Sequence, residues 1–329
     1  MLFIVLIFSY LLCEFRMVIV TGATGFIGSH LIKMLTRSMN EPIRAITRQS
    51  IETELPDAVE FIQGDINHWR SLSPHLEPGA TLINLAYSNQ NSLGDVSDSI
   101  SEMIEVCAEK GIKRLIHCSS ISVYGRVKGR VTEQTLCAPI DEYGKMKLAV
   151  EKTLLDQVQG RFELVILRPT EVFGSGGKTL RTLINALLMH NKHINYMRSS
   201  LFGRRRTHLV PVETVVDAIR FLCVDKREYR KEIFMISADA ERLNSFYDIE
   251  QLLREELCLI RHPLPLIMMP RIVLENVMRI AGRATVDSNI IYSASKLEKL
   301  GFHNQYCLKE ALRIHARTYI NLNSIERVD

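Results

Sequence analysis

The sequence has 329 residues, 47% of them hydrophobic, which is enough for one large α/β domain with a smaller companion and a buried core. Its 41 basic and 37 acidic residues are dispersed and leave a net charge of +4, so we expect a small-molecule partner and no nucleic acid. The sequence has seven cysteines, an odd number, and no Cys-x-x-Cys motif, which favours free thiols in a reducing, cytoplasmic setting.

Residues 1–16 contain an apolar run from Leu2 to Cys13. This run is shorter than the ~20 residues that cross a bilayer. No Lys or Arg precedes it and no small-residue cleavage pattern follows it, as a signal peptide would require. We interpret residues 1–16 as an extension from a start codon assigned too early, with a peripheral membrane anchor as the alternative, and expect no membrane partner.

The stretch from Val18 to His30 predicts a strand, a tight loop and a helix, because a β-branched run breaks into three glycines spaced three apart. Gly22 allows a sharp turn, Gly25 admits a pyrophosphate to the helix N-terminus, and Gly28 lets the helix lie close to the sheet. The pattern predicts a bound dinucleotide, although its first gap is one residue longer than usual. It resembles the extended short-chain dehydrogenase/reductases, the NAD(P)-dependent epimerase/dehydratase family. The resemblance implies cofactor contacts from Gly22, Gly25, Phe26, Ile27 and Gly28.

After a helix from Phe26 to Arg37, the residues from Ile43 to Arg48 predict a second strand, at whose end the adenosine ribose of a dinucleotide is recognised. Thr47 stands where NAD-preferring members of the family carry an acidic residue. Arg48 can pair bidentately with a 2′-phosphate. We therefore expect NADP or NAD, with NADP favoured; the alternative is an ordinary surface arginine.

A third strand is predicted from Val59 to Ile66 and a fourth from Thr81 to Tyr87. The resemblance implies that Asp65, followed by Ile66, accepts a hydrogen bond from the adenine amino group. It also implies that the backbone at Ala86 passes close to the cofactor. A Gly-Asp pair alone is only a turn signal, so the role of Asp65 depends on its order in the chain.

A helix is predicted from Ser99 to Gly111 and a fifth strand from Ile112 to Ser120. In the family, a Ser or Thr before a Val-Tyr-Gly segment contacts the substrate. This implies a substrate-binding and catalytic role for Ser120 and a structural role for Ser119. The alternative is that both serines cap the end of the strand.

Tyr143 and Lys147 are four residues apart and therefore lie on one face of a predicted helix. A nearby ammonium favours the phenolate and lowers the pKa of a tyrosine from its usual ~10. Tyr143 would then act as a general acid or base, and Lys147 could also hold the nicotinamide ribose. We assign the catalytic set to Ser120, Tyr143 and Lys147, and the last two also to the cofactor site.

The resemblance continues beyond this helix. The segment from Leu164 to Gly174 is similar to a sixth strand and an Arg-Pro loop that borders nicotinamide and substrate, which adds Pro169 to the cofactor site. The segment from Arg206 to Glu213 resembles a returning strand whose arginine grips a substrate diphosphate. Of the three arginines at 204–206, we expect one to face the pocket and two to face water.

The chain departs from the family in three places. No asparagine occurs between Asn91 and Asn185, where many members use one as a proton relay. Thr170–Glu171 replaces an asparagine that is frequent in nucleotide-sugar enzymes, which weakens that assignment. Ile121–Ser122 replaces the Asp-Glu pair of dehydratases, so dehydration ranks last.

We predict an α/β fold with a doubly wound, Rossmann-type parallel sheet and a smaller C-terminal lobe. Residues 17–175 and 206–238 form the predicted dinucleotide-binding domain, and residues 176–205 and 239–329 form the predicted substrate-binding lobe.

The leading function is an NAD(P)-dependent epimerase or oxidoreductase that acts on a carbinol or carbonyl carbon of a nucleotide sugar. One alternative is an NADPH-dependent carbonyl reductase of a non-nucleotide substrate; the other is a cofactor sensor that has lost catalysis. No metal is predicted. The resemblance also implies a homodimer formed through the helices at 99–111 and 143–159.

Overall fold

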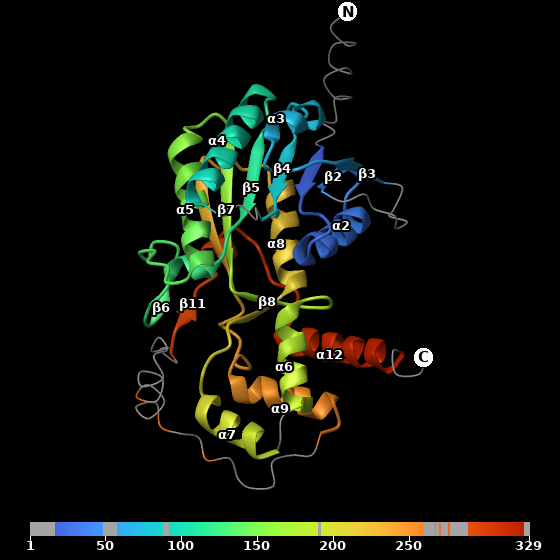
Figure 1. Cartoon of the computed structure of the whole chain (residues 1–329), viewed down its shortest axis with the longest axis vertical. Coiled ribbons are helices and arrows are strands. Elements are labelled where there is room, and N and C mark those ends of the chain that lie inside the picture. The colour runs from blue at the N-terminus through green and yellow to red at the C-terminus, as the bar shows by residue number, and fades with distance from the viewer. Residues whose placement is uncertain are drawn as a thin grey trace, which may run out of the picture. The chain divides into compact units, whose positions relative to one another are not determined.

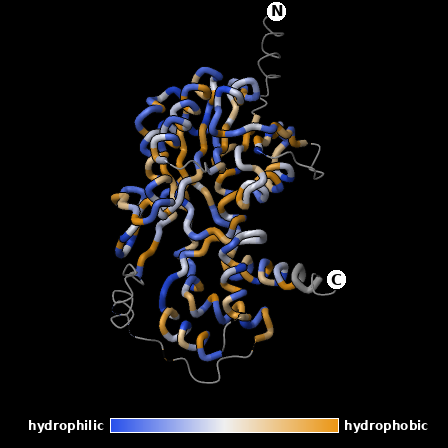
Figure 2. Tube along the Cα trace, in the orientation of Figure 1, coloured by the Kyte–Doolittle hydropathy of each residue, from blue (hydrophilic) through white to orange (hydrophobic). Residues whose placement is uncertain are grey.

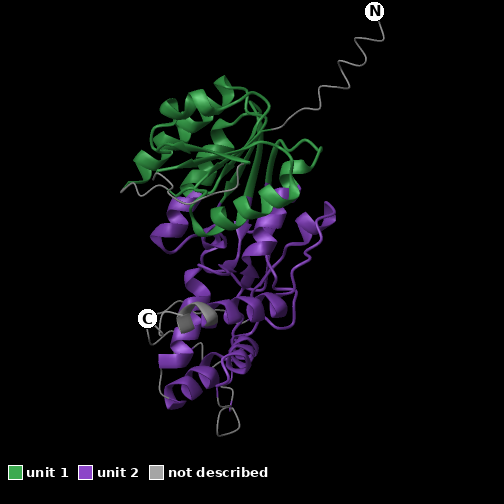
Figure 3. Ribbon diagram, turned by 90° about the vertical axis from the view of Figure 1, so that its right-hand side faces the viewer, with its two compact units in different colours: residues 1–118, 149–166, 222–232 green, residues 119–148, 167–221, 233–329 purple. Residues whose placement is uncertain are grey.

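The computed structural model describes residues 17–48, 58–87, 92–189, 192–259, 267, 270, 276 and 289–325. The apolar extension at 1–16 lies outside the described residues. The chain forms two compact units, which Figure 3 colours separately. Unit 1 comprises residues 1–118, 149–166 and 222–232, and unit 2 comprises residues 119–148, 167–221 and 233–329. The predicted domains divide the chain by the ligand that each part is expected to bind, whereas these units are defined by compactness. The two predicted domains therefore stay a prediction.

A seven-stranded sheet has the order β10-β7-β5-β4-β1-β2-β3. Its strands in chain order are β1 (Val18–Thr21), β2 (Ile43–Thr47), β3 (Val59–Gln63), β4 (Thr81–Asn84), β5 (Arg114–Cys118), β7 (Glu163–Pro169) and β10 (Lys231–Ile236). The pairings of β1 with β2 and β4, of β2 with β3 and of β4 with β5 are parallel, and Val18 lies beside both Ile43 and Thr81. The chain first extends the sheet on one side of β1 and then on the other, which defines a doubly wound sheet. The predicted fold class is confirmed.

Helices alternate with these strands, as Figure 1 shows. They are α2 (Phe26–Ser38), α3 (Trp69–Leu72), the 3₁₀ helix η1 (Ser73–His75), α4 (Leu93–Glu109), α5 (Glu142–Gln157) and α8 (Val212–Val224). Every residue of β1, β2, β4 and β5 is buried, as expected for parallel strands covered on both faces. Figure 2 correspondingly colours much of the sheet as hydrophobic.

Helix α4 begins six residues before the predicted start at Ser99. The hydroxyl of Ser92 accepts a hydrogen bond from the backbone N–H of Asp95 at 3.1 Å and so caps the helix. The first turn, Leu93 to Val96, is mostly exposed and lacks apolar periodicity, which is why the prediction missed it.

Arg114 connects distant parts of unit 1. Its buried guanidinium donates from Nε to Oε2 of Glu163 at 2.7 Å and lies 4.7 Å from the ring centroid of Tyr229. Its other nitrogens donate to the backbone carbonyls of Leu222, Asp225 and Arg227. The buried charge is thus both paired and hydrogen-bonded, which its burial requires.

Unit 2 contains two short parallel pairs, β8 with β9 and β6 with β11. Its elements are η2 (Ile121–Tyr124), β6 (Arg130–Val131), β8 (Glu171–Phe173), α6 (Lys178–Met189), α7 (Lys192–Phe202), β9 (Leu209–Pro211), α9 (Phe246–Glu256), β11 (Ile291–Tyr292), α11 (Ser295–Lys299) and α12 (Leu308–Ile325). Side chains from α6, α9 and α12 share one apolar core around Phe173, Ile184 and Leu312. None of the described helices combines the length and the apolar composition that crossing a membrane requires.

Candidate functional site

Unit 1 has a cavity of about 650 Å³ at the ends of β1, β2, β3 and β4. These are the carboxyl ends of parallel strands, where ligands bind in doubly wound sheets. Five predicted cofactor residues line it: Gly22, Gly25, Arg48, Ile66 and Ala86. Asp65 lies between two lining residues, and its Oδ1 accepts the backbone N–H of Asn67 at 3.0 Å. Phe26, Ile27 and Gly28 form the first turn of α2.

The glycines of this loop are required by close backbone contacts. Gly22 has φ +70°, and a Cβ there would lie 2.8 Å from the backbone nitrogen of Ala86. At Gly28 a Cβ would lie 2.1 Å from the carbonyl oxygen of Gly22. Gly28 therefore lets α2 pack on the Gly22 turn, whereas the sequence predicted a close approach to the sheet itself.

The start of α2 leaves backbone donors for an anion. Its N-cap is Gly25, which has no side chain that could accept a hydrogen bond from the first N–H groups, and its first turn contains no acidic residue. The first N–H groups of a helix have no intrahelical acceptor, so this end attracts phosphate. The described residues that line the cavity include no acidic side chain. The cavity, the glycine turn and these donors together fit a dinucleotide.

In unit 2, Ser120 stands at the start of η2. Its Oγ accepts the backbone N–H of Ser122 at 3.2 Å and caps this short helix. Ser119 is buried, and its N–H donates to the carbonyl of Leu167 at 2.7 Å. The capping role considered for Ser120 is therefore present, and its contact with substrate stays a prediction.

Tyr143 and Lys147 lie one turn apart on α5. The Lys147 Nζ is 5.9 Å from the centroid of the Tyr143 ring. The tyrosine is 44% exposed and the lysine 7% exposed, so the charge is held beneath an accessible ring. A Cβ at Gly144 would lie 2.5 Å from the carbonyl oxygen of Ser122, so this glycine lets α5 pack directly on η2.

Tyr124, the other tyrosine of this region, has a different environment. Arg168 donates from Nη1 to its hydroxyl at 2.8 Å, and both side chains are buried. Burial raises the pKa of Tyr124 to about 12, although the Arg168 charge opposes this shift. Tyr124 therefore stays protonated near neutral pH, which makes it a poor proton acceptor.

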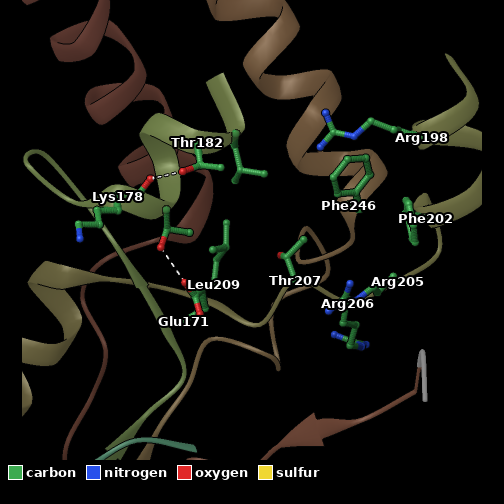
Figure 4. Close-up of a pocket in the computed structure, with 12 residues that line it drawn as sticks. Glu171, Lys178, Thr182, Arg198, Phe202, Arg205, Arg206, Thr207, Leu209 and Phe246 are labelled. Atoms are coloured by element: carbon green, nitrogen blue, oxygen red, sulfur yellow. Dashed lines mark hydrogen bonds between the residues drawn. The ribbon is translucent and has the colours of Figure 1, made fainter. Parts of the chain in front are cut away.

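A second cavity, of about 590 Å³, lies within unit 2 and is cationic. Figure 4 shows Lys178, Arg198, Arg205 and Arg206 around it. Among the described lining residues the one carboxylate is that of Glu171, which accepts the hydroxyl of Thr179 at 2.6 Å. Four basic side chains against one carboxylate suit an anionic ligand. The described lining includes none of Ser120, Tyr143 and Lys147.

The expectation that only one arginine of the cluster faces a pocket is wrong. Arg205 and Arg206 both line the cationic cavity, while Arg204 is exposed. Arg206 donates from Nη1 to the carbonyl of Asp239 at 2.8 Å, which fixes its direction. Burial lowers the pKa of Arg205 below its usual value. The sequence could not separate the three arginines, because the turn after α7 decides which way each points.

The fold and the glycine turn define a dinucleotide-binding α/β protein. Residues 18–237 match the model of the NAD dependent epimerase/dehydratase family. The chain belongs to this family, which confirms the predicted relationship to the extended short-chain dehydrogenase/reductases and places it among NAD-dependent enzymes.

Individual relatives agree with this placement. A UDP-glucose 4-epimerase of Vibrio cholerae is 27% identical over 242 residues, 68% of this chain and 70% of that protein. The N-acetyl-α-D-glucosaminyl-diphospho-ditrans,octacis-undecaprenol 4-epimerase of Escherichia coli O157:H7 is 22% identical over 90% of this chain and 92% of its own length.

Among solved structures, a UDP-glucuronic acid 4-epimerase from Bacillus cereus, in complex with UDP-glucuronic acid and NAD, superposes with a TM-score of 0.71. It is 20% identical, and the match covers 93% of this chain and 100% of that one. At this identity the likeness establishes the fold alone.

Proposed function

We propose that this protein is an NAD(P)-dependent epimerase or oxidoreductase that acts on a carbinol or carbonyl carbon of a nucleotide sugar. The observation that carries the proposal is the placement of Lys147 beneath the accessible ring of Tyr143. A buried ammonium at this position favours the negative charge that a tyrosine acquires when it gives up its proton.

Each residue of the set has a distinct role in this proposal. Tyr143 exchanges a proton with the substrate hydroxyl, and Lys147 supports that exchange electrostatically. Ser120 donates a hydrogen bond to the reacting oxygen in place of the one that its hydroxyl gives to Oγ of Ser122 at 3.2 Å, while it continues to cap η2 as an acceptor. The chain lacks the asparagine relay of other members, so Tyr143 exchanges its proton with solvent directly in our proposal, as its exposure permits.

The nicotinamide cofactor, when bound, supplies or receives the hydride at the reacting carbon. The cavity of unit 1 would hold its adenosine half. Gly22, Gly25 and the first turn of α2 would face the pyrophosphate, and Asp65 the adenine amino group.

The cationic cavity of unit 2 would hold the substrate diphosphate. Arg205 and Arg206 would neutralise its charge, and the ring of Phe246, 5.9 Å from the Arg198 guanidinium, offers an aromatic face to a base. The UDP-sugar relatives support this substrate class.

Tyr143→Phe tests the assignment. We expect turnover of UDP-sugars to fall about 10²- to 10⁴-fold, the usual contribution of a general acid–base group, while cofactor affinity stays within about twofold. Progress is followed by chromatography of the sugar nucleotides, and cofactor binding by calorimetry. Tyr306→Phe, outside both cavities, is the matched control and should behave as wild type. Full turnover by Tyr143→Phe would refute the role.

Arg48 favours a second candidate, an NADPH-dependent carbonyl reductase of a non-nucleotide substrate. Arg48 has no carboxylate beside it among the described residues that line the cavity, which suits a 2′-phosphate. Mass spectrometry of dinucleotide released from the denatured protein separates the candidates. Retained NAD⁺ or NADP⁺ is expected of an epimerase, which regenerates its cofactor in each cycle. An empty protein that binds NADPH and not NADH is expected of the reductase.

A further inference from the structure

The corner where α6 ends and α7 begins is a feature that the proposed reaction does not use. The side-chain amide of Asn195, which is buried in α7, donates to the backbone carbonyl of Leu187 in α6 at 3.1 Å. This bond fixes the last residues of α6 beside the first turns of α7. We call the residues from Leu187 to Met197 that the structure describes the α6–α7 corner.

Large apolar side chains project into solvent at this corner. The exposed fractions are 49% for Leu188, 82% for Met189, 47% for Ile194 and 69% for Met197. Single exposed apolar residues are normal on protein surfaces. Four of them lie between Leu188 and Met197, and a concentration of exposed apolar side chains of this kind is typical of an interaction surface.

The chain around the corner is strongly basic. Between Glu171 and Glu213 the sequence has seven Lys and Arg residues and no Asp or Glu; four of them line the cationic cavity, which leaves Arg181, Lys192 and Arg204 outside it. Arg181 and Lys192 are exposed on the two helices. Positive charge and projecting apolar groups therefore occupy the same stretch of chain.

Helix α9, which lies beside the corner, carries four acidic residues, Asp248, Glu250, Glu255 and Glu256, of which Glu255 is exposed. Helix α9 packs against α7, and its Glu250 is buried and accepts Nε of Arg254 at 2.8 Å. Ser245 caps α9 by accepting the backbone N–H of Asp248 and donates its hydroxyl to the Asp248 carboxylate, and Glu256 pairs with Arg317 at 2.7 Å. The corner itself, residues 187–197, contains Lys192 and no Asp or Glu.

We propose that the α6–α7 corner docks on an anionic lipid bilayer. Interfacial helices insert apolar side chains at the boundary of headgroups and acyl chains, while Lys and Arg contact the lipid phosphates. A nucleic acid would use the basic residues but would leave Met189 and Met197 in water, so a membrane surface fits both properties better. The sequence analysis missed this surface because only the fold shows which apolar residues of the two helices are exposed.

Quenching of a local tryptophan tests the proposal on the full-length chain. Met197→Trp places a reporter in the corner, and Leu136→Trp places one at a position that is 85% exposed and outside the corner. The native Trp69 is buried and contributes the same emission to both variants. Vesicles contain phosphatidylcholine with or without phosphatidylglycerol, and their acyl chains are brominated.

We expect the reporter emission of Met197→Trp to fall about twofold or more with anionic vesicles, and that of Leu136→Trp to stay unchanged. Vesicle binding through residues 1–16 alone would leave both reporters unquenched and would overturn the proposal. Equal quenching of both would overturn it as well. An emission change with a single-stranded oligonucleotide and none with vesicles would assign the corner to nucleic acid instead.

Charge reversal gives a second, independent readout. Lys192→Glu should weaken binding of the Met197→Trp protein to anionic vesicles about fivefold or more, because one basic residue near such a surface contributes ~1 kcal/mol. Lys299→Glu, an exposed residue of α11, is the control and should leave the affinity unchanged. If both substitutions weakened vesicle binding equally, binding would depend only on the net charge of the protein, and the assignment of the α6–α7 corner as the docking surface would be overturned. Neither assay depends on turnover, so failure here leaves the proposed reaction untouched.

Discussion

Arg48 is the residue on which the choice between the two nicotinamide cofactors depends. It lines the cavity of unit 1 at the end of β2, where Thr47 leaves no carboxylate to bind a free ribose hydroxyl. Arg48→Gln should raise the KM for NADPH about 10- to 100-fold and leave that for NADH nearly unchanged, since a charge-assisted hydrogen bond contributes roughly 1.5–3 kcal/mol. Arg37→Gln, exposed at the end of α2, is the control. Equal loss with both cofactors would contradict a phosphate contact.

Arg205 and its neighbour Arg204 provide a matched pair for the cationic cavity. Arg205 lines the cavity and Arg204 is exposed. Arg205→Ala should raise the KM for a UDP-sugar about tenfold or more with little change in kcat, because the lost contact holds substrate and transition state equally. Arg204→Ala should have wild-type kinetics. Steady-state assays at fixed cofactor concentration measure KM and kcat of both variants. Identical kinetic constants for the two variants would place the diphosphate outside this cavity.

The segment of residues 222–232 contains a carboxylate, that of Asp225, whose contribution to stability depends on pH. Burial opposes ionisation of Asp225, but hydrogen bonds from Arg227 and from the Tyr229 hydroxyl prevail and lower its pKa to about 2. The depressed pKa means that the carboxylate stabilises the fold above pH ~4, and that this contribution is lost as the pH falls from ~4 toward 2.

Asp225→Asn should therefore lower the free energy of unfolding by about 1 kcal/mol at pH 7, a value reduced because Arg227 is half exposed and screened by solvent. The difference from wild type should shrink below pH 4. Urea unfolding followed by circular dichroism at several pH values measures it. Asp98→Asn, at an exposed position of α4, serves as the control. A difference that persists unchanged to pH 2 would contradict this account.

At the level of elements, the sequence predicted most of the sheet because apolar periodicity is a local signal. Strand β2 was expected to end at Arg48 and ends at Thr47. The packing of α5 on η2 was not predictable, because the contact that makes Gly144 necessary comes from Ser122, more than twenty residues away. The two-residue strands β6 and β11 pair residues that lie 161 positions apart and carry no periodic signal of their own.

For the whole molecule, the family resemblance predicts a homodimer through α4 and α5. Sedimentation velocity should give a mass of about twice the 37.6 kDa chain at micromolar concentration. A concentration series checks that the species does not dissociate within the range used for kinetics. A single species of one chain would refute the prediction.

The candidate site was predictable wherever a motif is contiguous in sequence, as in the glycine turn and the Tyr143–Lys147 pair. It was not predictable where the site is assembled from distant segments. The cationic cavity takes Lys178 from α6, Arg198 from α7 and Arg205 from the turn after α7, and no spacing rule relates these three residues. Only the packing of the helices places their charges around one space.

The hydrogen bonds of Arg114 also constrain the order in which the protein can fold during synthesis. Its side chain requires carbonyl groups from residues 222–227, which the ribosome adds more than a hundred residues after β5. Until those residues emerge, a nascent chain that had already closed the rest of unit 1 would enclose a guanidinium that is paired with Glu163 but lacks these carbonyl acceptors, which is unfavourable. Unit 1 therefore completes its folding only after the whole segment of unit 2 at 167–221 has been made, and chains truncated before residue 222 should be aggregation-prone substrates for chaperones.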